Sequence, residues 1–262
     1  MRTPAALLEK PRATGEVARI PNETVARLGF WSGAACAATS VAFFLGVAAN
    51  ATIVPANRWI EDLRLYAASY NPAAMLVTVV PSILIVPSFL GLVVAVHSSV
   101  SDGRRAFTLL AVVLAAVYAA ILVTNYYLQL SFVRANVLTG NAADVASLLM
   151  ENPRGLFWPI ESLAYGIQGI ALGLAAAAFA AGGLERWIRL SFIVVALSGV
   201  LSLAAGIRGV ELTDPAFIIG GTAWGIGFPM SAVLSAVFFW RNGLRRRIGD
   251  NSIRLSLFVP RS

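Results

Sequence analysis

The stretch AFTLLAVVLAAVYAAILVTNYYLQLSFV, residues 106–133, contains 28 residues and no Asp, Glu, Lys or Arg. An α-helix needs about 20 mainly apolar residues to cross the hydrocarbon core of a bilayer. The stretch meets this requirement and therefore predicts a transmembrane helix. It decides the class of the protein, because a chain with such a helix is expected to fold in a membrane.

Five further apolar stretches lie on either side of this one. They cover about residues 28–54, 72–97, 156–181, 187–207 and 215–240. Tryptophan and tyrosine residues lie mostly near the ends of the stretches, where their amphipathic rings suit the membrane interface. The sequence therefore predicts an all-α membrane protein, a bundle of six transmembrane helices.

The composition agrees with this class. Charged residues make up 13% of the chain, against about 25% in an average soluble domain. Hydrophobic residues make up 58%, and the mean hydropathy is +0.76. A single six-span membrane domain, residues 28–240, is expected between a leader, residues 1–27, and a basic tail, residues 241–262.

Basic residues are distributed unevenly between the two sides of the predicted bundle. Five lie in the loops after the first, third and fifth spans: Arg58, Arg64, Arg134, Arg154 and Arg208. Fifteen lie in the leader, the tail and the other two loops: Arg2, Lys10, Arg12, Arg19, Arg27, Arg104, Arg105, Arg186, Arg189, Arg241, Arg245, Arg246, Arg247, Arg254 and Arg261. Because cytoplasmic loops carry the excess of Lys and Arg, the leader and the tail are both expected in the cytoplasm.

The kind of basic residue also indicates an origin. Nineteen of the twenty basic residues are arginine, and the chain is rich in alanine and glycine, a bias typical of high-GC bacterial genomes. The bacterial inner (plasma) membrane is therefore the expected location. The net charge of +7 does not indicate nucleic acid, since the basic residues lie at the ends of apolar stretches. Membrane lipids are the expected partners.

Two of the external loops are patterned as short amphipathic helices on the outer surface. In residues 58–70 the apolar side chains share one helical face. They are Trp59, Ile60, Leu63 and Tyr66. A second helix is expected between Asn141, as its cap, and Asn152. Its apolar side chains are Val145, Leu148 and Leu149.

Small residues spaced by four occur in three of the spans. The pairs are Gly33 with Ala37, Gly169 with Gly173, and Gly221 with Gly225. Small side chains let the backbones of two membrane helices approach closely. All three pairs are therefore expected at helix–helix contacts.

Glu161 is the main candidate for a functional residue, because a charge at membrane depth is costly unless it faces a cavity or a partner. It lies about one turn inside the fourth span. Tyr165 and Gln168 follow it at i+4 and i+7, so the three side chains share one helical face. They are the first part of a candidate ligand-binding site.

Polar residues of the neighbouring spans are expected at the same level. Asn125 and Gln129 share a stripe of the third span with Tyr118. The third helix runs outward and the fourth inward, which places Asn125, Gln129 and Glu161 in the outer half of the bundle. Arg208, at the outer end of the fifth span, is long enough to reach towards Glu161 as a counter-charge.

Two interpretations of these residues are open. They form either a polar cavity open to the outside, with Glu161 as its ligand-binding or proton-carrying group, or a hydrogen-bonded cluster that holds helices together. The first predicts a protein that binds or transports a small molecule or lipid. The second agrees with a non-catalytic structural or regulatory component that docks a membrane-protein partner.

Several chemistries lack the residues they need. His97 is the only histidine and Cys36 the only cysteine, so a haem between two histidines and a zinc site of several His or Cys ligands are not expected. The sequence therefore predicts no cofactor and no metal. No pairing of a nucleophile with a base is evident, which leaves enzymatic activity open and favours a non-catalytic role.

The plan as a whole resembles a known group of proteins. It combines six spans, short external helices after the first and third, and the turn GGLERW, residues 182–187, into the fifth. In this it is similar to bacterial six-helix membrane proteins that form a family of unknown function. The likeness covers most of residues 25–242. It implies the six-span fold, and it implies no activity and no site residue.

Overall fold

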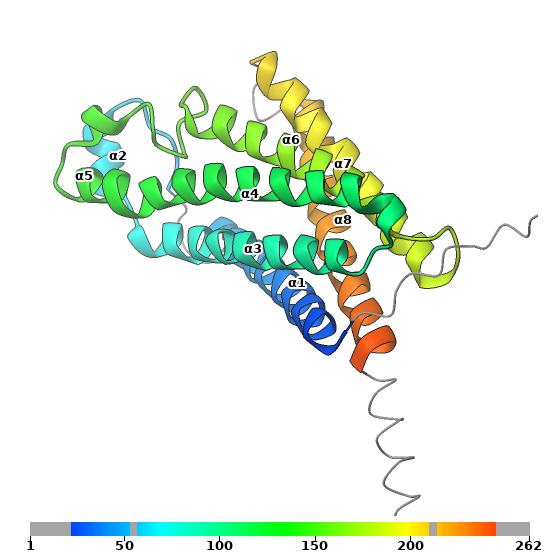
Figure 1. The fold of residues 1–262 in the computed structure, drawn as a ribbon. Helices are drawn as coiled ribbons and strands as arrows, with labels where there is room; N and C mark the ends of the chain where they lie inside the picture. Colours follow the sequence, from blue (N-terminus) through cyan, green and yellow to red (C-terminus); the bar gives the residue numbers. More distant parts are fainter. Residues whose placement is uncertain (1–21, 53–56, 210–213, 245–262) are drawn as a thin grey trace, which may run out of the picture.

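The computed structural model describes residues 22–52, 57–209 and 214–244, so most of the predicted leader and tail lies outside the described residues. Within these ranges the chain forms helices and turns, with no β-strand (Figure 1). Six helices are long and apolar enough to cross a membrane, which confirms the predicted all-α bundle. The protein is therefore a multi-pass membrane protein.

The six spans agree with the predicted stretches to within a few residues at most ends. Their main helices are α1 (Glu23–Thr52), α3 (Pro72–Ser98), α4 (Arg105–Leu128), α6 (Phe157–Ala175), α7 (Gly183–Ile207) and α8 (Pro215–Phe239). Short helical turns extend three of them: η1 (Asp102–Arg104), η2 (Gln129–Val133), α5 (Arg134–Leu138), η4 (Ala176–Ala178) and η5 (Trp240–Leu244). The third span is the longest, because η1, α4, η2 and α5 join into one rod, Asp102–Leu138.

Capping side chains decide where several spans begin. Asn22 accepts a hydrogen bond from a backbone N–H of the first turn at 2.9 Å, so α1 begins at Glu23, earlier than the predicted residue 28. Asn71 caps α3 in the same way, and the proline that follows is favoured in a first turn. Asp214 caps α8. These polar residues mark the start of these three spans more sharply than hydropathy does.

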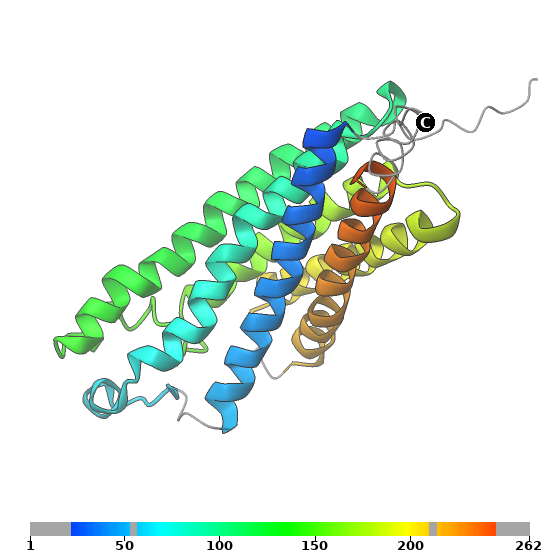
Figure 2. The same cartoon turned by 90° about the horizontal axis from the view of Figure 1, so that it is seen from below.

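The six spans form a closed ring. Each packs against its neighbours in chain order, and α1 closes the ring by packing against α8. Successive spans run in opposite directions, so the ring has two ends (Figures 1 and 2). We name the end that carries α2 and η3 the loop end, and the end that carries η1 and the turn 179–182 the turn end. Aromatic rings fill the interior towards the turn end, where Phe179 packs against Phe192 and Phe238.

The two predicted surface helices form, in shorter versions than expected. Helix α2 (Leu63–Ser69) begins only after Asp62, which caps it, so the start of the predicted range 58–70 is not helical. After Asn141 the chain makes a single 3-10 turn, η3 (Ala142–Val145), and the Asn141 side chain forms no capping hydrogen bond. The second prediction was therefore wrong in length and in its cap.

The predicted apolar side chains of these loops nevertheless pack together. They form one cluster with the end of the third span: Tyr66, Val133, Val137, Ala142, Val145 and Leu149, with Trp59, Ile60, Leu63 and Leu148 against it. The apolar pattern thus correctly predicted which side chains pack together, although it predicted longer helices than those that form. The cluster covers part of the loop end.

Small residues explain the close contacts of the ring, with one exception. A Cβ atom at Gly33 would lie 2.9 Å from the carbonyl oxygen of Ala232 on α8, and one at Gly169 would lie 2.8 Å from that of Ala196 on α7. A Cβ atom at Gly221, by contrast, would meet no atom within 4 Å. Gly221 was expected at a helix contact, and that prediction was wrong, because α1 and α8 are apart at its level.

Candidate functional site

A cavity of about 630 Å³ lies inside the ring at the loop end. All six spans contribute to its wall, together with the loop that precedes α6. Most of the lining surface is apolar, and its polar groups are few. Small-molecule sites in proteins are usually cavities of roughly 300–1,000 Å³ with this kind of lining. The cavity therefore has the size and surface of a ligand site.

The exposed part of the lining belongs to α1 and α8. Phe44 and Val47 on α1 are 37% and 44% exposed, whereas Met75 and Phe157 on the opposite wall are buried. Towards the turn end α1 and α8 are in close contact, and they diverge towards the loop end, where Gly221 has open space beside it (Figure 2). The cavity therefore opens between the loop-end halves of α1 and α8.

Glu161 lies on the cavity wall formed by α6, and only 6% of the residue is exposed. The hydroxyl of Tyr126 on α4 donates a hydrogen bond to Glu161 Oε1 at 2.5 Å. Among the ion pairs of residues 22–52, 57–209 and 214–244, none involves Glu161. The carboxylate is thus buried and bound by a neutral donor, with no counter-charge from the described part of the chain.

Tyr165 and Gln168 continue the same helical face, and only the first lines the cavity. The Tyr165 ring packs edge to face against Trp224 of α8, with centroids 5.0 Å apart. Gln168 is fully buried, and its Oε1 accepts a hydrogen bond from the indole N–H of Trp224 at 2.8 Å. Gln168 therefore positions the Trp224 ring, which is itself part of the cavity wall.

Asn125 and Gln129 are buried near the cavity without lining it. The Asn125 amide donates to the carbonyl oxygen of Phe157 at 3.3 Å, which ties α4 to the start of α6. Gln129 lies in the π-helical turn η2, where its Nε2 donates to Leu148 O at 2.7 Å and its Oε1 accepts from Met150 N at 3.2 Å. Both residues hold helices and loops in place, as the second interpretation of the polar cluster described.

Arg208 lies at the surface rather than beside Glu161. Its guanidinium is 4.0 Å from the carboxylate of Asp214, and its side chain is 62% exposed. The residue follows the last turn of α7, and its side chain lies at the loop end beside the carboxylate of Asp214. The structure thus pairs Arg208 with Asp214 and not, as expected, with Glu161.

Glu151, which no sequence pattern singled out, borders the cavity at the loop end. The Tyr66 hydroxyl of α2 donates a hydrogen bond to Glu151 Oε2 at 2.9 Å. Burial raises the pKa of Glu151 above its ordinary value, and hydrogen bonds from Tyr66 and Asn57 offset only part of this rise. Burial, followed by the charge of Glu151, also raises the pKa of Tyr66. The protonated form of Glu151 therefore stabilises the contact between α2 and the loop before α6.

We expect this contact to loosen as the pH rises. A carboxyl group whose pKa is raised in the folded state stabilises that state fully below its unfolded pKa, and the contribution is lost as the pH rises through the folded pKa. Amide exchange of α2, corrected for the intrinsic rate, should show more opening as the pH goes from about 4 to about 8. The variant Glu151→Gln should not show this trend. The same trend in both proteins would contradict a role for Glu151.

Two lining side chains carry a buried polar atom that has no hydrogen-bond partner among the described residues. These atoms are Oδ1 of Asn50 and the indole Nε1 of Trp158. The Asn50 amide is held in place, because its Nδ2 donates to Ala74 O at 2.6 Å. Buried polar atoms are nearly always hydrogen-bonded, so each of these marks a position where a bound molecule or water can supply the missing partner.

Sequence reasoning missed Tyr126, Trp224 and Glu151. Tyr126 lies eight residues after Tyr118 and thus on the same stripe as Asn125. That spacing could have identified it. For Trp224 and Glu151 no local signal exists, because their partners Gln168 and Tyr66 are distant in the sequence.

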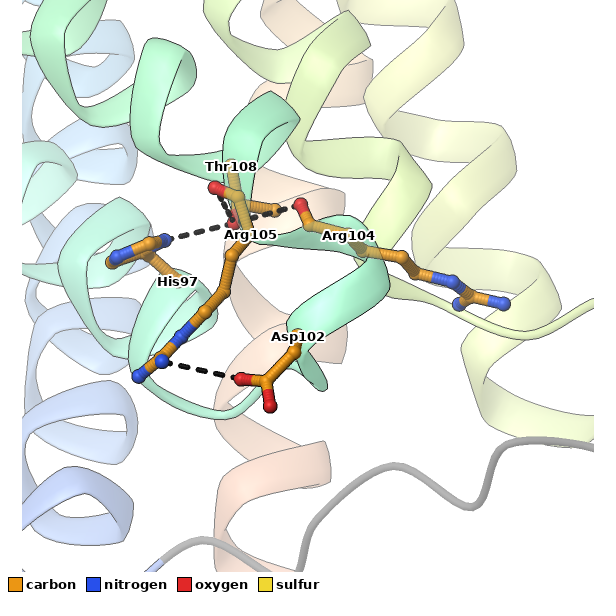
Figure 3. A network of polar contacts seen from close by, with 5 residues as sticks. All are labelled: His97, Asp102, Arg104, Arg105 and Thr108. Carbon is orange, nitrogen blue, oxygen red and sulfur yellow. Dashed lines mark hydrogen bonds and ion pairs between the residues drawn. The ribbon is translucent and has the colours of Figure 1, made fainter.

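A second group of polar residues lies at the turn end, in the hairpin between α3 and α4 (Figure 3). His97 Nδ1 lies 2.8 Å from Thr108 Oγ1, and the Arg105 guanidinium lies 3.2 Å from Asp102 Oδ1. The Arg104 side chain points away from the other four. These contacts join residues of one hairpin. The group is therefore a structural tie between α3 and α4.

Among the residues that the structure describes, no three His, Cys, Asp or Glu side chains lie close enough to hold a metal ion. Comparisons of the chain with protein-family models, with curated proteins and with solved structures gave no match. The resemblance to bacterial six-helix membrane proteins thus stays a prediction from the sequence plan. The cavity and its carboxylates are the features from which a function can be inferred.

Proposed function

We propose that this protein binds, and in its full activity transports, a small molecule or lipid that it holds in the cavity around Glu161. One observation carries the proposal: a cavity of about 630 Å³, mostly apolar, has a buried carboxylate on its wall. Ligand sites typically combine such a surface with a few polar groups. A carboxylate at membrane depth is costly, and most such residues serve a function.

We further propose that the loop end faces the outside of a bacterial inner membrane and that both chain termini are cytoplasmic. The support is the distribution of basic residues, five on the side of the loop end against fifteen on the other. In this orientation the opening between α1 and α8 faces the outer leaflet. An apolar ligand would then enter from the bilayer without crossing water.

Gly221 allows the binding function to be tested with little disturbance of the fold. A Cβ atom there meets nothing within 4 Å, so a phenylalanine can occupy the cavity without displacing backbone. We expect Gly221→Phe to weaken binding of the neutral probe N-phenylnaphthylamine at least about tenfold. Gly221→Ala removes the same glycine but leaves most of the volume, and its affinity should stay near that of the original protein. Energy transfer from tryptophan to the probe in nanodiscs, with protein-free nanodiscs as blank, measures the binding.

Equal affinity in all three proteins, with unchanged thermal unfolding, would contradict the proposal. The alternative function, a non-catalytic structural or regulatory component, predicts this result. It also predicts that another membrane protein co-purifies with this one from native membranes and that Glu161→Gln leaves the association intact.

A further inference from the structure

The ionisable groups of the cavity wall favour a ligand with a positive charge. Among the described residues that line it, the carboxyl groups are those of Glu161 and Glu151, and none of the lining residues is Lys, Arg or His. The other titratable side chains of the described lining are the phenols of Tyr126 and Tyr165. A buried negative charge is costly unless a positive charge accompanies it. No such positive charge lies on the described wall, so a cationic ligand would stabilise the charged form of Glu161.

Aromatic rings share the cavity wall with Glu161. Tyr165 packs edge to face on Trp224, and the centroid of the Phe44 ring lies 6.3 Å from that of the indole. Further rings complete the wall: Phe43, Phe157, Trp158 and Phe217. The faces of aromatic rings attract cations, and tryptophan does so most strongly. The apolar part of the wall therefore favours the same sign of charge as the carboxylates.

The hydrogen-bonding atoms of the cavity wall also favour a positively charged ligand. Tyr126 occupies Oε1 of Glu161, and Asn50 offers a buried acceptor, Oδ1, that has no partner in the described structure. An ammonium group carries only donors, so it matches a carboxylate and an amide oxygen. Among the described lining residues the unpartnered donor is Nε1 of Trp158, which suits a hydroxyl or carbonyl elsewhere on the ligand.

We propose that the cavity binds an amphipathic organic cation, whose positive group pairs with Glu161 and whose apolar body packs against the aromatic wall. This inference rests on the proposed binding function and adds the chemical class of the ligand. An anion of the same shape would be repelled by Glu161 and Glu151, and a neutral molecule would leave Glu161 without a counter-charge. Selection between ligands of one shape should therefore follow their charge.

Tetraphenylphosphonium and tetraphenylborate test this directly, because they have nearly the same shape and opposite charge. Binding to the protein in nanodiscs of neutral lipid is measured by titration calorimetry, with empty nanodiscs to subtract partitioning into lipid. We expect the cation to bind at least about tenfold more tightly than the anion. Glu161→Gln should remove most of this preference, and Glu161→Asp, which keeps the charge, should retain more of it. Glu61→Gln, at an exposed acid that does not line the cavity, should change nothing.

The possible results separate the ligand class from the binding function itself. If cation and anion bind equally and Gly221→Phe weakens both, the cavity binds apolar ligands and the cation inference is overturned. A cation preference that survives undiminished in Glu161→Gln would also overturn the pairing with Glu161, because Glu151 or the surface would then be its source. If neither probe shows binding that Gly221→Phe weakens, and N-phenylnaphthylamine shows none either, the proposed function fails as well.

Discussion

Replacing Gly199 with leucine is expected to force α6 and α7 apart and to lower the free energy of unfolding by about 3 kcal/mol or more. A Cβ atom at this position would run into the carbonyl oxygen of Tyr165 and lie 3.0 Å from the Cα atom of Gly169. Both obstacles are backbone atoms, which cannot rotate away as a side chain can. Because Gly199 and Tyr165 also line the cavity, ligand binding should be lost with the packing.

Thermal unfolding in detergent, followed by tryptophan fluorescence, measures this effect. Gly221→Ala is the matched control, since it makes a glycine-to-alanine change on a span where the new methyl group meets nothing within 4 Å. It should unfold at or above the temperature of the original protein, because alanine favours the helix over glycine by about 1 kcal/mol. Unchanged unfolding of Gly199→Leu would mean that α6 and α7 do not approach at this position.

Trp224→Ala is the second change with a large expected effect, a loss of roughly 3–5 kcal/mol of unfolding free energy. The indole is 9% exposed, stacks on Phe228 with centroids 5.2 Å apart and packs edge to face on Tyr165. Its N–H also donates a hydrogen bond to Oε1 of Gln168. The Nε2 atom of the same Gln168 amide already has no partner among the described residues. The substitution therefore enlarges the cavity and leaves a buried amide without any hydrogen bond from the described chain.

Trp224→Phe separates the two contributions. It retains an aromatic ring against Phe228 and Tyr165 and removes only the hydrogen bond to Gln168. Hydrogen bonds between membrane helices are worth about 0.6 kcal/mol on average, so the loss should be near or below about 1 kcal/mol. A loss as large as that of Trp224→Ala would show that the hydrogen bond to Gln168, rather than the ring packing, holds α8 against α6.

Much of the fold could be predicted because each span is a local property of the chain. A run such as residues 106–133 must be helical in a bilayer, since every backbone polar group needs a partner within the segment. The same holds for the start of α3, where Asn71 and Pro72 act on their own helix. Loop structure was less predictable, because the side chains after Asn141 are held by α2 and the end of the third span rather than by a helix of their own.

The candidate site could be predicted only in part. Hydropathy identified Glu161 as an unusual charge, and helical spacing placed Tyr165 on the same face. The hydrogen bond from Tyr126 and the pairing of Arg208 with Asp214 depend on how neighbouring helices are rotated and where they end. Spacing along one helix contains no information about that rotation.

By itself, then, the sequence determined the number of spans, their helical nature and the single acid at membrane depth, because a bilayer imposes these requirements on each segment separately. Only the tertiary structure decided that the six helices close into a ring and that α1 and α8 diverge at the loop end. Gly221 and Gly225 illustrate the reason. They are one turn apart, yet a Cβ atom at Gly225 would lie 2.9 Å from Phe44, whereas one at Gly221 would meet open space. A cavity arises from the angle between two helices, and that angle is set by side-chain contacts far apart in the chain.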